Sequence, residues 1–319
     1  MIYFFCFLLS FLCAWGVSRY AQYLRLIDVP SRRSSHFVPT PKGGGAGLLV
    51  VFMLVSTIAT PWFFWLTAAA LSLLSFLNDI SELSPKTRLF VQGLGAIILL
   101  SGFYMVGEWK SNFFTFIESG FFLLFIVATT NCYNFMDGIN GIAGLMGLVG
   151  FGLLGVYLHP LDSSLSMVSF ALVAGCAGFL PFNIPSAKVF MGDVGSILLG
   201  YVFSSIVVFS AADLLEFTVM TSFLMLFYLD EISSIYLRLK KKRSLLEPHR
   251  WHLYQVLANE VGLAHWKISA GYALIQLIVG LITLHLQKFG LFWLSVFIVC
   301  ISSIYLICDL YIKRKYQIS

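Results

Sequence analysis

Long apolar runs separated by short polar clusters make up most of this chain. The hydrocarbon core of a bilayer is about 30 Å thick, so a helix needs roughly 20 apolar residues to cross it. A helix also satisfies its own backbone hydrogen bonds where no water is present. Cutting the sequence at its polar clusters predicts about eleven transmembrane helices, at residues 2–21, 45–60, 62–77, 89–106, 119–135, 141–158, 165–182, 196–211, 214–235, 268–286 and 290–311.

Only Pro61 separates the second and third of these runs. One bent helix over residues 45–77 would reduce the count to ten, but that run is longer than a single crossing needs, so two helices are expected. The first run lacks the positive start and the cleavage site of a secretory signal, and it is expected to remain as the first helix. The predicted fold is an all-α, polytopic membrane bundle in which residues 1–319 form a single domain.

The composition excludes a soluble protein. Charged residues make up 11% of the chain, against about 25% in soluble proteins. Hydrophobic residues reach 59%, which is more apolar side chain than a globule of this size can hide from water. Soluble enzymes, disordered scaffolds and nucleic-acid-binding domains are therefore excluded, and membrane lipid is the expected surrounding.

The basic residues predict the orientation of the bundle, because Lys and Arg in short loops remain cytoplasmic. If the first helix starts outside, only Lys110 and Lys288 among the 20 Lys and Arg residues fall on the outer side. The amino terminus is therefore expected outside and the carboxyl terminus in the cytoplasm. On this map the loops at about 22–44, 78–88, 131–141, 183–196 and 236–267 face the cytoplasm and are expected to form the active site.

Three aspartates, Asp79, Asp137 and Asp193, each fall at the cytoplasmic mouth of a predicted helix. Carboxylates at membrane depth are costly, so such residues usually serve a site. For one loop alone, an Asp that only caps the next helix would be the better interpretation, but three loops on one side favour a shared site. The same loops carry four amides and a cation, at Asn78, Asn131, Asn134, Asn183 and Lys188.

Carboxylates with Asn neighbours suit a hard cation such as Mg²⁺, which usually reaches proteins through one or two carboxylates and the phosphates of a substrate. Phosphate chemistry at the cytoplasmic face is therefore expected. Two other inner loops supply groups that could hold phosphate oxygens, namely Arg33, His36 and Lys42 in the first and His249, Arg250 and His252 in the last.

Taken together, these loops resemble the polyprenyl-phosphate N-acetylhexosamine-1-phosphate transferases, the family of the muramoyl-pentapeptide translocase and of the initiating enzymes of O-antigen and teichoic-acid synthesis. The resemblance covers nearly the whole chain. Its motifs are D-x-P-x-x-R-x-x-H with P-x-P-K-G-G-G (28–45), N-D with S-P and R (78–88), N-x-x-N-x-x-D-G-x-x-G (131–141), N-x-P-x-A-K-x-F-M-G-D-x-G-S (183–196), an Asp followed by Arg (Asp230, Arg238) and H-R-x-H-L-Y-Q (249–255). The motif at 183–196 is the most specific.

The resemblance implies transfer of a sugar 1-phosphate from a UDP-N-acetylhexosamine to undecaprenyl phosphate, with release of UMP, at the bacterial inner membrane. It implies that Asp193 coordinates Mg²⁺, for which Mn²⁺ could substitute, and that Asp137 and Asn134 shape the nucleotide and metal site. His249, Arg250 and His252 would bind the sugar diphosphate. Arg33, His36 and Lys42 would bind the lipid phosphate, which Asp79 would orient.

Two positions depart from the family pattern. Asn78 replaces the first of a pair of aspartates, the one often proposed to deprotonate the lipid phosphate, and an Asn cannot do so. A phosphate monoester is already mostly dianionic at neutral pH, however, so its attack needs no strong base. Asn140 stands where the muramoyl translocases carry a further acid. With His-Arg-Trp-His in place of a histidine triplet, this favours the branch that starts surface polysaccharides such as O-antigen.

Two other functions remain open at this stage. A transporter or flippase would place carboxylates near the middle of its helices, and Asp230-Glu231 is the one feature that fits it. A catalytically inactive family member is the second alternative, and Asn78 is its best support. The sequence names neither the sugar nor the oligomeric state, although relatives are often homodimers.

Overall fold

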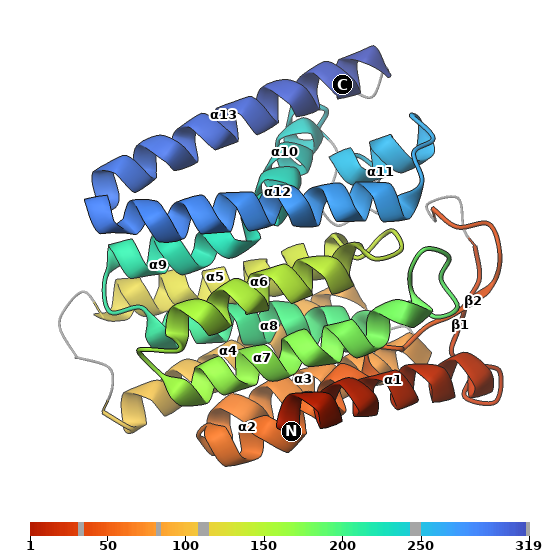
Figure 1. Ribbon diagram of the computed structural model, residues 1–319, viewed down its shortest axis with the longest axis horizontal. Helices are drawn as coiled ribbons and strands as arrows, with labels where there is room; N and C mark the ends of the chain where they lie inside the picture. The colour runs from red at the N-terminus through yellow and green to blue at the C-terminus, as the bar shows by residue number, and fades with distance from the viewer. Residues whose placement is uncertain (31–34, 81–83, 108–114, 243–249, 317–319) are drawn as a thin grey trace.

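The computed structural model describes residues 1–30, 35–80, 84–107, 115–242 and 250–316, and these are almost entirely helical (Figure 1). The first half of the chain forms α1 (Ile2–Tyr20), α2 (Ala46–Ala59), α3 (Trp62–Ile80), α4 (Pro85–Met105), α5 (Thr115–Phe135) and α6 (Ile142–Leu158). The second half forms α7 (Ser163–Phe179), η1 (Leu180–Phe182), α8 (Asp193–Ser210), α9 (Leu214–Thr221), η2 (Ser222–Leu224), α10 (Met225–Lys240), α11 (Leu253–Asn259), α12 (His265–Leu286), η3 (Gln287–Phe289) and α13 (Leu291–Lys315). Two short strands, β1 (Ile27–Asp28) and β2 (Thr40–Pro41), pair antiparallel with Ile27 opposite Pro41.

The predicted all-α membrane bundle is confirmed. Each predicted crossing coincides with a helical segment, and α2 and α3 are separate helices on either side of Pro61. Within the described ranges, 7 helices are long and apolar enough to cross a bilayer, while α2 and α6 are apolar but shorter. The chain is therefore a polytopic helical membrane protein, and its orientation stays a prediction.

Local capping explains where the observed helices differ from the predicted ones. Helix α4 begins earlier than predicted because the Ser84 side chain accepts a hydrogen bond from the Thr87 N–H at 3.1 Å and Pro85 occupies the first turn. The ninth predicted crossing is divided into α9, η2 and α10, and α10 continues to Lys240. Helix α11 was not predicted, because seven residues are too few to show a helical period.

Helix α8 lies inside the bundle, and every residue from Val194 to Val208 is buried. A helix that is apolar on all faces belongs in such an enclosed position. Helices α3 and α4 are hydrogen bonded to α8, one near its start and the other near its middle. The Ser72 hydroxyl of α3 donates to the Val194 carbonyl at 2.7 Å, and the Tyr201 hydroxyl donates to the Gly95 carbonyl of α4 at 3.0 Å. These contacts fix the first turn of α8 relative to α3 and α4.

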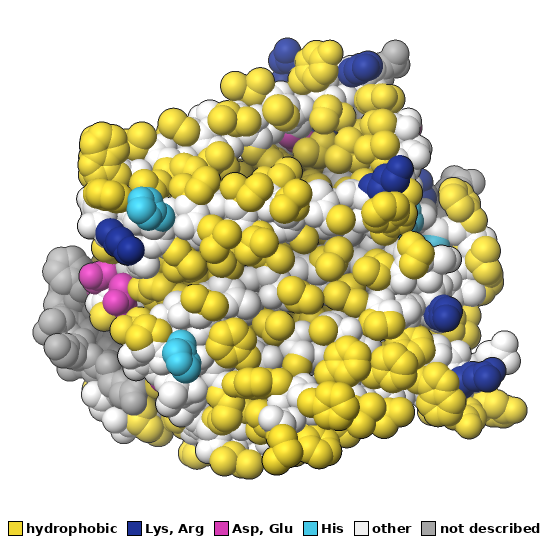
Figure 2. All heavy atoms as spheres, in the orientation of Figure 1, with side chains coloured by type: hydrophobic (Ala, Val, Ile, Leu, Met, Phe, Trp, Pro, Cys, Tyr) yellow, Lys and Arg dark blue, Asp and Glu magenta, His cyan; other side chains and the backbone are white. Residues whose placement is uncertain are grey.

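Hydrophobic side chains cover the visible flank of the bundle, while most of the visible Lys and Arg side chains lie toward the end that holds β1, β2 and α11 (Figure 2). An apolar band with a basic end is what a bilayer-embedded protein requires. The ends of α3 and α5 and the beginnings of α4 and α8 lie at this same end of the molecule (Figure 1).

Candidate active site

A cavity of about 540 Å³ opens where these helix ends meet. The three predicted aspartates, Asp79, Asp137 and Asp193, all line it, although they come from three separate loops. Five further side chains from the predicted set also line it, at His36, Lys42, Asn78, Asn134 and Asn183. The structure thus brings most of the predicted set into one polar chamber.

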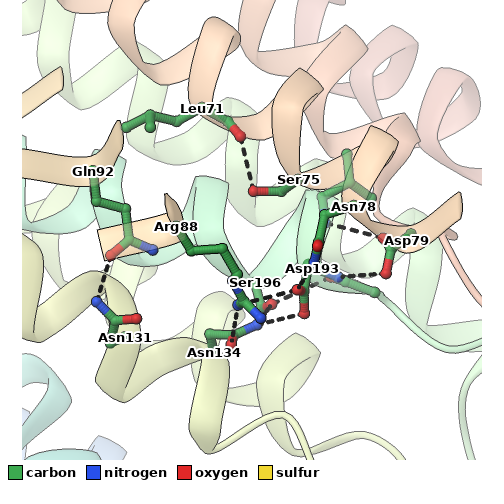
Figure 3. Close-up of polar contacts among 12 residues, drawn as sticks. Leu71, Ser75, Asn78, Asp79, Arg88, Gln92, Asn131, Asn134, Asp193 and Ser196 are labelled. Atoms are coloured by element: carbon green, nitrogen blue, oxygen red, sulfur yellow. Dashed lines mark hydrogen bonds and ion pairs between the residues drawn. The ribbon is translucent and has the colours of Figure 1, made fainter. Parts of the chain in front are cut away.

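Asp193, the first residue of α8, accepts hydrogen bonds on both carboxylate oxygens (Figure 3). Asn134 Nδ2 donates to Oδ1 at 2.8 Å, and Asn78 Nδ2 donates to Oδ2 at 3.0 Å. The Arg88 guanidinium lies 3.0 Å from Oδ2 and also donates to Asn134 Oδ1 at 3.0 Å. Asn134 Nδ2 reaches the Ser196 hydroxyl oxygen at 2.9 Å as well. Four elements, α3, α4, α5 and α8, therefore fix one carboxylate.

Asp79 faces the backbone at the start of α8. The N–H groups of Asp193 and Val194 donate to its two carboxylate oxygens at 3.5 and 3.4 Å, where the positive end of the helix dipole favours an anion. Lys42 Nζ lies 3.8 Å from Asp79 Oδ1. Gly192 permits this approach, because its φ is +76° and a Cβ there would lie 2.8 Å from Asp79 Oδ2.

Asp137 follows the end of α5, and its carboxyl group has a shifted pKa. Burial, followed by the negative charges of Asp193 and Asp79, raises the pKa of Asp137 to about 7. Mutual repulsion of this kind disfavours three ionised carboxylates without a cation among them. Among the described residues, however, no three His, Cys, Asp or Glu side chains lie close enough together to form a metal site by themselves.

Two predicted residues lie away from the chamber, and the side-chain amide of a third is hydrogen bonded to the protein backbone. Asn131 Nδ2 donates to Gln92 Oε1 at 2.5 Å between α5 and α4 (Figure 3), and the Lys188 side chain is exposed. Asn183 lines the chamber, but it accepts a hydrogen bond from Gly141 N–H at 2.6 Å and donates to the Val189 carbonyl at 2.9 Å. In this structure Asn183 therefore holds together the two loops that carry Asp137 and Asp193.

The predicted Arg and His residues are of three kinds: those outside the described residues, one that lines the chamber, and those that do not line it. Arg33 and His249 lie outside the described residues. His36 lines the chamber with its Nε2 3.7 Å from Asp28 Oδ2, and Arg250 is half-buried and is not among the lining residues. His252 is buried, with its ring nitrogens 3.5 Å from Asp230 and 3.6 Å from Glu231, so it points into the protein.

Sequence reasoning missed several residues that line the chamber or contact Asp193. Arg88 had a usable signal, because it is the Arg of the motif at 78–88 and lies directly before the apolar run at 89–106. Gln255 and His265 line the chamber from α11 and from the first residue of α12. Their position depends on how the last long loop folds back, and the spacing of apolar residues carries no information about that.

Comparison with known proteins identifies the family of this chain. The sequence profile of glycosyl transferase family 4 matches residues 61–211. An undecaprenyl-phosphate alpha-N-acetylglucosaminyl 1-phosphate transferase of Thermotoga maritima is 31% identical over 92% of this chain and 93% of its own length. A probable undecaprenyl-phosphate N-acetylglucosaminyl 1-phosphate transferase of Bacillus subtilis is 28% identical, over 91% of this chain and 85% of its own. A phospho-N-acetylmuramoyl-pentapeptide-transferase of Streptococcus pneumoniae is 28% identical over 60% of this chain and 68% of its own. With a relative this similar along nearly all of both chains, the protein belongs to glycosyl transferase family 4.

Proposed function

We propose that this protein transfers an N-acetylhexosamine 1-phosphate from a UDP-sugar to undecaprenyl phosphate at the cytoplasmic face of the bacterial inner membrane. An oxygen of the lipid phosphate forms a bond to the β-phosphorus of the donor. The bond from that phosphorus to the bridging oxygen breaks, and UMP leaves with the oxygen. The product is a lipid-linked diphosphosugar that starts a surface glycan of the O-antigen type.

The observation that carries this proposal is the convergence of Asp79, Asp137, Asp193, Arg88 and Lys42 on one chamber at the end of an apolar bundle. Phosphoryl transfer needs positioning and charge stabilisation more than covalent chemistry. Arg88 presents a planar guanidinium suited to phosphate oxygens, and Lys42 adds a second cation. A bilayer-embedded site of this kind can receive a lipid phosphate and a water-soluble nucleotide together.

The donor set fits Mg²⁺, with Mn²⁺ as the substitute. Mg²⁺ is usually held by one or two carboxylates and the substrate's own phosphates, and Asp193 and Asp137 supply two carboxylates to the same chamber. Burial and then the negative charges of Asp193 and Asp79 raise the pKa of Asp137, and a bound cation would favour the ionised form of this carboxyl group. When bound, the ion would spread the charge of the diphosphate and of the departing UMP. We expect transfer to stop when divalent cations are chelated.

The attacking phosphate needs no strong base from the protein. Its second pKa is near 6, so it is mostly dianionic at neutral pH. Asn78, in the place of a family aspartate, donates a hydrogen bond to Asp193 and therefore orients the carboxylate without adding charge. Asp79 is fixed by the first turn of α8 and by Lys42, and in this proposal it orients the acceptor.

Replacing Asn78 by Asp tests this role. A second carboxylate would face Asp193 Oδ2 at the position of the present 3.0 Å hydrogen bond, and like charges at this distance repel. We expect Asn78→Asp to lower kcat by about tenfold at pH 7 and to recover in part at higher Mg²⁺ concentration, because losing one hydrogen bond to a charged group costs about 1.5–3 kcal/mol. Steady-state kinetics over a Mg²⁺ series would measure this. A faster Asn78→Asp enzyme would instead mean that position 78 serves as a base.

The transporter alternative loses its main support in the structure. Asp230 is fully buried and accepts the backbone N–H of Leu253 at 2.7 Å, while Glu231 faces His252. These carboxylates hold the segment after α10 in place, so a path for ions is not needed to explain them.

A donor panel tests the proposed reaction and its specificity. The reconstituted protein, given undecaprenyl phosphate, Mg²⁺ and labelled UDP-N-acetylglucosamine or UDP-linked N-acetylated 6-deoxyhexoses, should form a butanol-soluble sugar product. The donor with the highest kcat/KM identifies the sugar. Uptake of label into sealed vesicles without covalent product would contradict the proposal and favour transport. No product and no uptake would favour an inactive member.

A further inference from the structure

Helix α11 reaches the chamber through Gln255, whose buried amide oxygen has no hydrogen-bond partner among the described residues. Gln255 lines the chamber and is 8% exposed. Its Oε1 accepts no hydrogen bond from the part of the chain that the structure describes. A buried acceptor left unpaired costs free energy, and this one belongs to a side chain that lines the chamber, where a ligand can bring a donor group.

Asp230 in α10 holds α11 in this position. Its Oδ1 accepts the Leu253 N–H at 2.7 Å, and its Oδ2 lies 3.4 Å from the Tyr254 nitrogen. These are N–H groups of the first turn of α11, which have no partner within a helix. The Tyr272 hydroxyl of α12 donates to Oδ2 at 2.7 Å, and His252 Nδ1 lies 3.5 Å from Oδ1. One buried carboxylate therefore ties α10, α11 and α12 together.

The same segment contacts the loop that carries Asp137. The Tyr254 hydroxyl donates to the Phe135 carbonyl at 2.9 Å, and a Cβ on Gly138 would collide with the Tyr254 hydroxyl. A displacement of α11 would therefore move both Gln255 and the backbone on either side of Asp137.

We propose that Asp230 is a positioning residue for donor binding: by capping α11 it places the Gln255 carboxamide oxygen to accept a hydrogen bond from an N–H or hydroxyl of the nucleotide sugar. This inference rests on the proposed function. Helix α11 belongs to the segment between α10 and α12, outside the long apolar helices, so it faces the water-soluble donor and not the polyprenyl chain. Its chamber neighbours Asn140 and His265 are also polar.

Ser233 provides a matched control, because replacing it also removes a buried polar group from α10, the helix that carries Asp230. Ser233 of α10 is hydrogen bonded to Asp309 of α13 and accepts from Lys313 Nζ at 3.1 Å. All three side chains are buried, and these bonds join α10 to α13 without involving α11. Ser233→Ala therefore weakens the packing of α10 while it leaves both Asp230 and the α11 cap intact.

The test compares Asp230→Asn, Gln255→Leu, their double variant and Ser233→Ala in the full-length reconstituted protein. We expect Asp230→Asn and Gln255→Leu each to raise the KM for the UDP-sugar by about tenfold and to leave the KM for undecaprenyl phosphate within about twofold. In the double variant the KM for the UDP-sugar should rise by less than the product of the two single increases, because both substitutions act through one contact. Ser233→Ala should keep both KM values. Hydrogen exchange should quicken at the Leu253 and Tyr254 amides in the two variants that carry Asp230→Asn, and not in Gln255→Leu or Ser233→Ala.

Inhibition by UMP identifies which part of the donor Gln255 contacts. If the inhibition constant for UMP rises together with the donor KM, the oxygen accepts from the uridine part of the donor, and if it stays at the wild-type value, the oxygen accepts from the N-acetylhexosamine. Both results support the proposal. An unchanged donor KM in Asp230→Asn, or an equal change in both KM values, would overturn it.

Calorimetric titration with the UDP-sugar, without acceptor, separates this proposal from the proposed reaction. Wild-type binding without any transfer would contradict only the reaction, and the weakening expected in Asp230→Asn would still be measurable. If the wild-type protein bound no UDP-sugar, the positioning role would fall together with the donor assignment.

Discussion

Asp193→Asn should lower kcat by about 10³-fold or more, because removing a preorganised charge from a phosphoryl-transfer site has effects of this size. The variant keeps the volume of the side chain but loses the charge that faces Arg88 at 3.0 Å. It also turns an N–H₂ group toward one of the two amide donors, Asn78 or Asn134, that now bond to carboxylate oxygens. Initial rates of lipid-linked product over a Mg²⁺ series would measure the loss.

Asp213→Asn is the matched control for this prediction. Asp213 caps the start of α9, where it accepts the Glu216 N–H at 2.9 Å, and an Asn caps a helix about as well as an Asp. If Asp193 only capped α8, both variants would behave like the wild type. Activity in Asp193→Asn comparable to that in Asp213→Asn would therefore contradict the catalytic assignment.

Arg88→Gln should lower kcat by about 10²-fold, the usual range for one preorganised donor at a site of developing charge. The guanidinium contacts Asp193 Oδ2 and Asn134 Oδ1 together, each at 3.0 Å. A Gln side chain cannot supply the charge. Arg88→Lys should restore only part of the activity, because a single ammonium cannot reproduce the planar, two-point contact. Both rates are measured at saturating donor and acceptor.

Lys86 offers the control for Arg88. It lies two residues earlier in the first turn of α4, and its side chain is exposed. Lys86→Gln removes the same formal charge from the same helix end and should keep kcat within about twofold, since exposed charges are largely screened. Equal losses in Lys86→Gln and Arg88→Gln would mean that only the overall basic charge of the helix end matters.

The helices could be predicted from the sequence because apolar runs of bilayer length have few alternative structures. The same pattern correctly predicted that α2 and α3 are separate helices on either side of Pro61. It also predicted that Asp79, Asp137 and Asp193 lie at one end of the bundle, where they line one chamber. Those predictions needed only the order of polar and apolar segments along the chain.

The pairing of particular side chains could not be predicted in this way. Arg88 and Asp193 are far apart in the sequence, and their contact depends on how α4 and α8 pack. His252 was expected to bind substrate, yet it packs against Asp230 and Glu231, because the segment after α10 folds back over α10. Spacing along the chain shows that a His-rich segment is near the site, but not which side chains turn inward.

Following the two phosphorus atoms of the donor tests the central claim most directly. A UDP-N-acetylhexosamine labelled with ³²P at the β-phosphorus should deliver its label to the lipid fraction in the presence of undecaprenyl phosphate and Mg²⁺, while label at the α-phosphorus should appear in UMP. The lipid label should be absent with Asp193→Asn. Release of β-labelled UDP, with unlabelled sugar on the lipid, would show transfer of the sugar alone and would contradict the account.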